Sequence, residues 1–469
     1  MFTGRENELK QLEKCFAKGC FQMVVLYGRR RVGKTTLLQE FSKGKRTLFF
    51  TAQIQSDQDN LADFSRTLHD FFELPPYMAS FASWDDAFSL VADKAATEHF
   101  LFIFDEFPYA VASCEALPSK LQIAIDHHLK RTDLCLVLCG SDQGFMESEV
   151  LGKKSPLYGR RSIQIRLCPF NFRDTANMLS WAQPEDAFKY YACVGGTPYY
   201  LSQIAPDLTF EENLADLFFN PMGFLYGEPL MLLQQELREP ALYNSVLRAI
   251  ASGANRQNEI ANKTGIAASS LPKYLQTMIR LDLIERIVPF GENPQTSKRG
   301  IYRLCEACYA FWYRFVAPFA SNIEAGAGKA VARNVQSNEL ADYLGHRFER
   351  VCQEWLLLKM TEESLPFPAI NFGSWWGTDP SKREQADIDV IAGNSKTRQI
   401  ILGECKWRTS FNETEALNTL KDRSTLIKDY SEHWYILFSK LPLAATTQAK
   451  VNADDHVSAV CLADMYGDL

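Results

Sequence analysis

The chain has 469 residues, of which 46% are hydrophobic and 23% are charged, and its formal net charge is -7. This length predicts about two to four domains, with enough hydrophobic residues for a packed core in each. The net charge gives no general attraction to nucleic acid, so such affinity would need a local basic surface. No apolar run reaches the ~18 residues of a membrane-spanning helix, and the N-terminus lacks the apolar region of a signal peptide. We therefore expect a cytoplasmic protein with no membrane partner.

The twelve cysteines are scattered, and many lie beside apolar residues. Cys305 and Cys308 lie close together in CEAC, but no second pair or histidine cluster follows them, so a zinc site is not expected. Buried reduced thiols are the simpler interpretation, and they suit a cytosolic protein.

Residues 1–168 alternate short apolar runs with helix-like stretches. This alternation is typical of an α/β unit with a parallel sheet. The expected strands are residues 21–28, 46–52, 99–106, 134–141 and 161–167.

Three further zones follow along the chain. Residues 169–238 are mostly helical, and residues 239–318 have the pattern of a small helical module that ends in a hairpin. After the small-residue stretch 321–330, residues 335–469 form a second α/β pattern. The sequence therefore predicts four domains, with these boundaries.

The segment GRRRVGKT, from Gly28 to Thr35, has the pattern G-x-x-x-x-G-K-T and lies between an apolar strand and a helix. In that context it predicts a phosphate-binding loop, because backbone N–H groups and the helix N-terminus face phosphate oxygens. Lys34 would contact the β- and γ-phosphates, and the Thr35 hydroxyl would bind Mg2+. The alternative is a glycine turn with a solvated lysine. The residues expected to contact ATP are Gly28, Arg29, Arg30, Arg31, Val32, Gly33, Lys34, Thr35 and Thr36.

Polar residues end two other apolar runs of this unit. Asp105 and Glu106 end FLFIFDE: Asp105 would hold Mg2+ and Glu106 would polarise the attacking water, so ATP hydrolysis is expected. Ser141 ends LVLCGS, where it would touch the γ-phosphate or that water. The alternatives are an acidic cap of the strand and a plain Gly-Ser turn.

Arg160 and Arg161, in PLYGRR, precede the last strand of this unit. We expect Arg160 to stabilise charge on the γ-phosphate, within the chain or from a neighbouring subunit, and the second case requires a homo-oligomer. The alternative is a surface arginine pair. Near the N-terminus, Thr3 and Glu6 fit a capping box for the first helix, and Arg5 could approach the edge of the nucleotide base.

Several motifs in order give the chain a family likeness. FTGRENELKQL, GRRRVGKTTLL, FIFDEF, CGS, PLYGRR and VGGTPYYL together resemble the archaeal-type ATPases of the AAA-related P-loop class, which also occur in bacteria. The likeness continues in AIASGANRQNEIANKTGI, KYLQTMIRLDLIER and FWYRFV, and covers nearly the whole chain. Family members usually have Asp-Pro ahead of the aromatic run, where this chain has Glu306 and Ala307, a difference that concerns a local turn.

Residues 255–287 have the pattern helix, turn, helix, with Gly265 at the turn and Ser269 or Ser270 capping the second helix. Two short strands around GENPQTSKRG follow and complete a winged helix-turn-helix. Residues 240–316 hold ten Lys/Arg and five Asp/Glu, a surplus of five positive charges. The alternative is a winged helix that docks protein or is purely structural. The basic residues expected to meet DNA phosphates are Arg256, Lys263, Lys273, Lys298 and Arg299.

The last zone carries acidic residues on neighbouring strands. Asp387 and Asp389 alternate on QADIDVIAG, and Glu404 and Lys406 share one face of RQIILGECKWR. An acidic residue on one strand and E-x-K on the next form the nuclease core written PD-(D/E)xK. Phosphodiester hydrolysis needs a hard cation on carboxylates and a group that activates water. The alternative is an exposed strand with alternating salt bridges.

In this nuclease hypothesis, Asp389 and Glu404 would bind Mg2+, Glu349 on the preceding helix would complete the metal shell, and Lys406 would position the water. The proline of the motif name is absent before either aspartate. Asp389 fits the family pattern of an aspartate between hydrophobic residues better than Asp387, so the resemblance favours it. The resemblance also implies a nuclease-like domain at this position.

We therefore expect an α/β protein with a P-loop NTPase parallel sheet, a helical lid, a winged helix-turn-helix and a C-terminal restriction-endonuclease-like domain. ATP and Mg2+ would be its cofactors, and DNA would bind through the winged helix and the C-terminal domain. The expected function is ATP hydrolysis that controls metal-dependent cleavage of DNA. The alternative is a nucleotide-dependent regulatory switch whose C-terminal domain only binds nucleic acid or protein.

Overall fold

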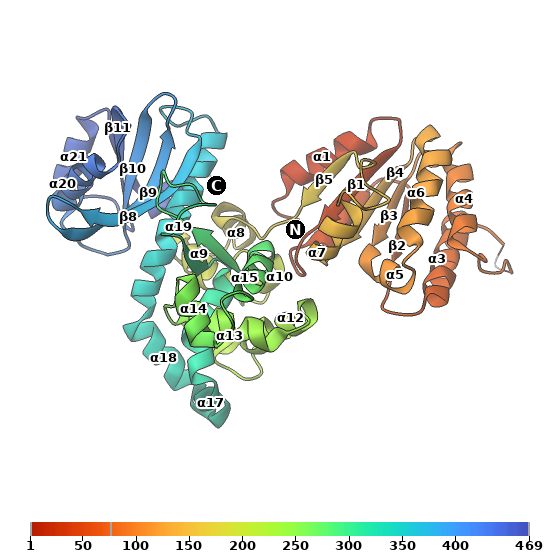
Figure 1. The fold of residues 1–469 in the computed structure, drawn as a ribbon, viewed down its shortest axis with the longest axis horizontal. Coiled ribbons are helices and arrows are strands. Elements are labelled where there is room, and N and C mark those ends of the chain that lie inside the picture. The colour runs from red at the N-terminus through yellow and green to blue at the C-terminus, as the bar shows by residue number, and fades with distance from the viewer. Residues whose placement is uncertain (1, 76, 468–469) are drawn as a thin grey trace. The chain divides into compact units, whose positions relative to one another are not determined.

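The computed structural model describes residues 2–75 and 77–467. The chain forms two compact units, residues 1–169 and 170–469. The first unit is built on a five-stranded parallel sheet in the order β2-β3-β4-β1-β5 (Figure 1). The α/β class and the parallel sheet are thus confirmed. The strands are β1 (Gln22–Tyr27), β2 (Thr47–Thr51), β3 (Leu101–Asp105), β4 (Cys135–Gly140) and β5 (Ile163–Arg166).

Both faces of this sheet are buried, because helices cover each of them. On β1, Met23 and Val25 point into a core formed with α3 to α6, while Val24 and Leu26 point into a core formed with α1 and α2. This alternation explains why the central residues of β1, Met23 to Leu26, are all apolar. The helices are α1 (Glu6–Phe16), α2 (Lys34–Ser42), α3 (Asp57–Phe71), α4 (Trp84–Ala95), α5 (Phe107–Ser113), α6 (Leu117–His127) and the short α7 (Gln143–Phe145).

The start of α1 differs from expectation. Arg5 is the N-cap residue, with a left-handed φ of 71°, and no side chain caps the helix. The capping box predicted for Thr3 and Glu6 is therefore wrong, because the chain turns one residue before Glu6 instead of entering the helix from an extended Thr3.

The second unit begins with helices. The pair α14 and α15 turns at Gly265, whose φ is 71°, and the antiparallel hairpin β6–β7 follows. Ser270 is the N-cap residue of α15, but its side chain makes no capping hydrogen bond. Among the described residues, no helix has both the length and the hydropathy that crossing a bilayer requires. The elements are α8 (Phe172–Met178), α9 (Pro184–Val194), α10 (Pro198–Leu201), α11 (Phe210–Phe218), α12 (Phe224–Glu236), α13 (Pro240–Ala251), α14 (Gln257–Thr264), α15 (Leu271–Arg280), β6 (Ile284–Ile287), β7 (Ile301–Leu304), α16 (Ala307–Phe311), the π-helical turn η3 (Trp312–Val316), α17 (Ala320–Asn322) and α18 (Gly328–Asn338).

A second five-stranded sheet, in blue in Figure 1, has the order β12-β11-β10-β9-β8. Strands β8, β9 and β10 pair antiparallel, whereas β10, β11 and β12 pair parallel, so the sheet is mixed. The elements of this sheet and its helices follow in the order helix, three strands, helix, strand, helix, strand and helix. The elements are α19 (Leu340–Thr361), β8 (Asn371–Asp379), β9 (Glu384–Asn394), β10 (Gln399–Lys406), α20 (Glu413–Arg423), β11 (Glu432–Ser439), α21 (Ala445–Asn452), β12 (Val457–Cys461) and α22 (Leu462–Tyr466).

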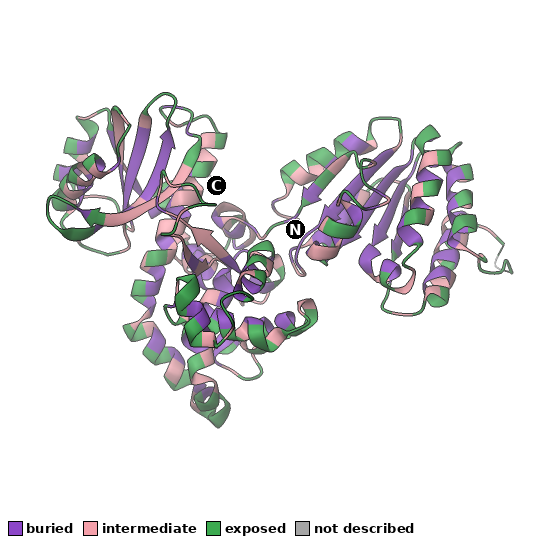
Figure 2. Cartoon of the chain, in the orientation of Figure 1, coloured by how far each residue is buried: buried purple, intermediate pink, exposed green. Residues whose placement is uncertain are grey.

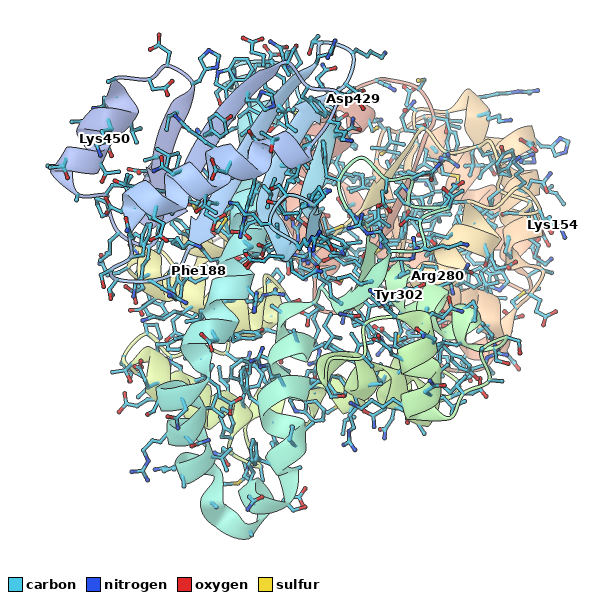
Figure 3. All side chains as sticks on the ribbon, turned by 60° about the vertical axis from the view of Figure 1, so that its left-hand side comes forward. Lys154, Phe188, Arg280, Tyr302, Asp429 and Lys450 are labelled. Carbon is cyan, nitrogen blue, oxygen red and sulfur yellow. The ribbon has the colours of Figure 1, made fainter. Side chains whose placement is uncertain are left out.

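One continuous core joins the helices and the mixed sheet of the second unit (Figure 2). Phe188 of α9, labelled in Figure 3, packs between this sheet and α19: its ring centroid lies 4.3 Å from that of Trp407 and 5.8 Å from that of Phe348. The Tyr343 hydroxyl of α19 also donates a 3.0 Å hydrogen bond to the Ala192 carbonyl of α9. The division of this unit into a lid, a winged helix and a nuclease-like domain stays a prediction.

Candidate nucleotide and metal sites

The phosphate-binding loop lies between β1 and α2 and curls around Lys34. Gly33, at φ 91°, is the N-cap residue of α2, and Arg31 has φ 70°. The buried Lys34 ammonium donates 2.9 Å hydrogen bonds to the carbonyls of Gly28 and Arg29. A cation is thus held inside a ring of backbone, beside the positive end of a helix, where phosphate oxygens would accept hydrogen bonds.

Two residues outside the phosphate-binding loop, Leu167 and Arg5, contact its backbone. A Cβ at Gly28 would lie 2.2 Å from the Leu167 carbonyl oxygen, so only glycine fits against the end of β5. The Arg5 guanidinium donates hydrogen bonds to the carbonyls of Val32 (3.2 Å) and Cys168 (2.5 Å). Arg5 therefore supports the loop backbone, a contact that the sequence did not predict.

The residues predicted for Mg2+ and for water activation meet at the carboxyl ends of β3 and β4. The Thr35 hydroxyl donates to Asp105 Oδ2 at 3.3 Å, and the Ser141 hydroxyl donates to both carboxylate oxygens of Glu106 at 2.9 and 3.0 Å. Glu106 has a left-handed φ of 50°, which turns its side chain toward β4. A hydroxyl and a carboxylate are the oxygen donors that Mg2+ prefers, so this group fits the ion.

Arg160 lies in a different environment. Its guanidinium makes a bidentate pair with Asp126 of α6, at 3.1 and 2.5 Å, and donates to the carbonyls of Pro156 and Tyr158. Hydrogen bonds from Arg160, and then from Lys130, hold the pKa of the Asp126 carboxyl well below its usual value. Within this unit Arg160 thus anchors its own loop to α6.

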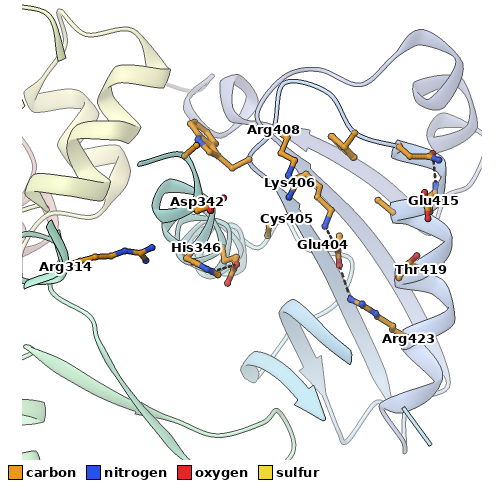
Figure 4. Close-up of a pocket in the computed structure, with 17 residues that line it drawn as sticks. Arg314, Asp342, His346, Glu404, Cys405, Lys406, Arg408, Glu415, Thr419 and Arg423 are labelled. Carbon is orange, nitrogen blue, oxygen red and sulfur yellow. Dashed lines mark hydrogen bonds and ion pairs between the residues drawn. The ribbon is translucent and has the colours of Figure 1, made fainter. Parts of the chain in front are cut away.

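A cleft of about 670 Å³ opens over the end of β10, between α19 and α20 (Figure 4). Its floor is the stretch Glu404 to Arg408, one wall is a stripe of α19 around His346, and the other is a stripe of α20 around Thr419. Arg314 of η3 reaches it from the side. This is the place that the E-x-K pattern predicts.

Asp389 of β9 interacts electrostatically with two carboxylates that line this cleft, Glu404 and Glu349. Burial first, and then the charges of Glu404 and Glu349, raise the pKa of the Asp389 carboxyl well above its usual value. Asp389 also accepts a 2.8 Å hydrogen bond from the Cys405 N–H. A cation beside these carboxylates would favour the ionised form of Asp389 and so lower its pKa.

Glu404 is held by two basic side chains. Lys406 Nζ lies 2.5 Å from Glu404 Oε1, while the buried Oε2 makes no hydrogen bond among the described residues and lies 3.9 Å from Arg423. Burial lowers the pKa of Lys406, but the hydrogen bond to Glu404 and the charges of Glu404 and Asp389 together outweigh burial, so that pKa is raised. The unsatisfied oxygen fits a metal ligand, yet in the part of the chain described, no three His, Cys, Asp or Glu side chains are gathered to hold an ion.

The cleft contains side chains that sequence reasoning missed. Arg423 donates to the Asp387 carboxylate at 3.0 Å and to its carbonyl at 2.8 Å, and His346 pairs with Glu349 at 3.2 Å. Asp387 is therefore paired with Arg423, whereas Asp389 is the aspartate that interacts electrostatically with Glu404. His346 precedes Glu349 by one helical turn and was visible as a pattern, whereas nothing in the sequence ties Arg423 to β10.

A parallel sheet whose first strand runs through G-x-x-x-x-G-K-T into a helix defines a P-loop ATPase. Residues 2–204 match the family described as an ATPase domain predominantly from Archaea, and residues 312–417 match one described as Archaea bacterial proteins of unknown function. An uncharacterized protein of Methanocaldococcus jannaschii is 30% identical over 459 residues, which cover 97% of this chain and 98% of that protein. The chain belongs to this family of archaeal ATPases, as its motifs predicted.

Two further proteins are similar to parts of this chain. An uncharacterized ATP-binding protein of the same organism is 44% identical over 46 residues, 10% of this chain and 78% of that protein. The structure of the Walker-type ATPase of Pyrococcus abyssi has a TM-score of 0.52 at 18% identity, and the match covers 67% of this chain and 96% of that one. The second likeness concerns the fold.

Proposed function

We propose that this ATPase binds DNA and cleaves it in a metal-dependent reaction under nucleotide control. The observation that carries the proposal is Glu404 on the cleft floor: one carboxylate oxygen pairs with Lys406, and the other is buried and makes no hydrogen bond among the described residues. Asp389, on the neighbouring strand β9, interacts electrostatically with Glu404. Glu349, on the α19 wall, would be the third carboxylate. Its charge contributes to the raised pKa of Asp389, so the two are electrostatically close.

In the ATPase unit, ATP would supply the phosphoryl group, and bound Mg2+ would offset the negative charge of the phosphates. Lys34 would exchange its loop carbonyls for phosphate oxygens, while Thr35 and Asp105 would hold the ion. Glu106 would orient the attacking water, and the Ser141 hydroxyl, whose proton is shared between the two carboxylate oxygens, would keep that carboxylate in one place.

In the cleft, a bound Mg2+ supplies the Lewis acid that polarises a phosphodiester. Asp389, Glu404 and Glu349 would hold that ion. Lys406 would release Glu404 and donate a hydrogen bond to the attacking water, and Arg423 would be free to turn toward a phosphate oxygen. Lys406 starts from an ion pair with Glu404 of the floor, and Arg423 from an ion pair with Asp387 of β9.

DNA would meet the second unit through α14 and α15. Arg256, Lys263 and Lys273 are exposed there, as a phosphate-binding surface requires. Arg299 is less suited to that role, because its guanidinium pairs with Glu292 at 2.8 Å and donates to a carbonyl of β8. We therefore assign the DNA contact to the helices and to the exposed Lys298, and not to Arg299.

A cleavage assay tests this function. Plasmid and linear DNA would be incubated with Mg2+ or Mn2+, with and without ATP, using the wild type, Lys34→Ala, Glu404→Gln and the control Glu415→Gln. Glu415 lines the cleft wall, so its substitution makes the same charge change away from the floor. Cleavage lost in Glu404→Gln and kept in Glu415→Gln is the expected result. Equal cleavage by wild type and Glu404→Gln would refute it.

A second candidate is a nucleotide-dependent switch whose cleft binds a partner without cutting it. It is favoured by the ion pair between Lys406 and Glu404, which occupies one of the two carboxylate oxygens. ATP hydrolysis that persists without cleavage of any DNA substrate would select this candidate. Loss of hydrolysis in Lys34→Ala would show that the preparation is active in its first unit.

A further inference from the structure

Arg30, the third residue of the phosphate-binding loop, is bonded to a residue 79 positions later in the chain. Its guanidinium donates a 2.5 Å hydrogen bond to the Tyr109 hydroxyl of α5. Tyr109 is half-buried, and its ring packs against the core that β1 forms with α3 to α6. The bond therefore ties the middle of the loop to the helix that follows β3.

Tyr109 also lies in the turn that positions Glu106. Glu106 is the N-cap residue of α5, at a left-handed φ of 50°, and its carbonyl accepts a 2.9 Å hydrogen bond from the Tyr109 N–H. The backbone of Tyr109 is thus bonded to the residue proposed to orient the attacking water. Its side chain is bonded to the loop that would hold the phosphates, so one residue joins the two parts of the ATPase site.

The turn that carries Glu106 has little freedom to move. Phe107 is fully buried, and Pro108 packs so closely on β4 that a Cβ at Gly140 would lie 2.7 Å from Pro108 Cδ. Because proline also fixes its own backbone φ, this turn cannot easily follow a shift of the loop. The turn is therefore a rigid support, against which the Tyr109 hydroxyl holds the loop.

The phosphate-binding loop has other supports on the side of β5. Gly28 lies against the end of β5, and Arg5 donates to the Val32 carbonyl. Without the Tyr109 hydroxyl these contacts would still hold both ends of the loop, so the loop would still bind phosphates. Its middle would lose its fixed distance from Glu106, and a shift of about 1 Å between reacting groups can cost about 100-fold in rate.

We propose that Tyr109 is a positioning residue for ATP hydrolysis: through Arg30 it holds the middle of the phosphate-binding loop in place relative to Glu106, so that the γ-phosphate faces the attacking water. The inference rests on the proposed role of Glu106, and it adds the residue that aligns this carboxylate with the loop. The Tyr109 hydroxyl would then contribute to the rate of hydrolysis and not to the affinity for ATP.

The test compares Tyr109→Phe with the wild type in steady-state ATPase kinetics and in titration with a fluorescent ATP analogue. The substitution keeps the ring in the core and removes only the hydroxyl. We expect kcat to fall about 10-fold, as the loss of a hydrogen bond to a charged group allows, while the Kd for the analogue stays unchanged. Tyr77 is 87% exposed, so the control Tyr77→Phe removes a hydroxyl of the same unit and should leave both constants unchanged.

A double-mutant cycle shows whether Tyr109 acts through Arg30. Arg30→Met removes the guanidinium, so at saturating ATP the double variant Arg30→Met with Tyr109→Phe should have the kcat of Arg30→Met alone. Losses that multiply independently would overturn the positioning role, even if Tyr109→Phe is slow.

Glu106→Gln separates the two proposals. If Glu106→Gln binds the analogue without hydrolysing ATP, and Tyr109→Phe keeps the wild-type kcat, the positioning role is overturned and the role of Glu106 stands. If Glu106→Gln hydrolyses ATP as fast as the wild type, both are overturned. A Kd that rises as kcat falls in Tyr109→Phe would show that the loop itself is disrupted, which also overturns the positioning role; a melting temperature equal to that of the wild type shows that the variant is folded.

Discussion

Gly28 gives the sharpest test of the nucleotide site. In Gly28→Ala, the new Cβ would lie 2.2 Å from the Leu167 carbonyl oxygen, whereas real Cβ contacts stay above 3.0 Å. The backbone must therefore move by roughly 0.8 Å, the difference between these two distances. Leu167 cannot yield easily, because its side chain is buried and its N–H donates a 2.7 Å hydrogen bond to Tyr27.

Overpacking that displaces backbone costs up to about 3 kcal/mol. For a unit of this size, that loss lowers the melting temperature by about 6–12 °C. Because the displaced residue begins the phosphate-binding loop, we also expect the affinity for ATP to fall about 10-fold or more. Calorimetric melting and titration with a fluorescent ATP analogue would measure the two effects.

Gly44→Ala is the matched control. Gly44 has φ 71°, and no heavy atom lies within 4 Å of a Cβ built there, so its substitution adds backbone strain without a clash. The strain is worth about 1–2 kcal/mol and should leave ATP affinity unchanged. If Gly28→Ala and Gly44→Ala lose the same stability and both keep ATP affinity, the steric argument for the loop is refuted.

Three further predictions follow from single contacts. Ser141→Ala should lower the ATPase kcat about 10-fold with little change in ATP affinity, because Glu106 loses its hydroxyl donor; an unchanged kcat in steady-state kinetics would contradict this. Asp126→Asn should destabilise the first unit by about 1 kcal/mol at pH 7, since Arg160 lowers the pKa of Asp126. A lowered pKa stabilises the fold above the usual carboxyl pKa of 3.8, so denaturation curves of the two proteins should converge as the pH falls below that value. Phe290→Ala should make the β6–β7 hairpin cleavable by protease in the folded chain, because the Phe290 ring packs against the core of the mixed sheet; resistance equal to wild type would show that the tip is held without its ring.

The sequence predicted the first sheet well because its signals are local. In the phosphate-binding loop, residue type, spacing and the change from strand to helix all depend on about fifteen consecutive residues. The same holds for Asp105 and Glu106 at the end of β3, which follow an apolar run. Ser141 was placed correctly at a strand end, but its bond to Glu106 depends on β3 and β4 being neighbours in the sheet.

Contacts between distant segments were beyond sequence reasoning. Arg160 pairs with a residue 34 positions earlier, and Arg299 donates to a residue 77 positions later. The sequence alone does not show whether a basic residue pairs with a phosphate or with a carboxylate. The place of Arg423 in the cleft was missed for the same reason. It depends on the packing of α20 against β9 and β10, which no local sequence pattern predicts.

The packing of Phe188 against Trp407 and Phe348 limits how the chain can be truncated. A fragment that starts at residue 335 would leave Trp407 and Phe348 without the aromatic ring that covers them, and would remove Tyr191 from Glu354. Such a fragment would expose apolar surface and aggregate. The smallest piece expected to fold by itself at this end is residues 170–469, so the cleft cannot be transplanted into another protein without the helices that precede it.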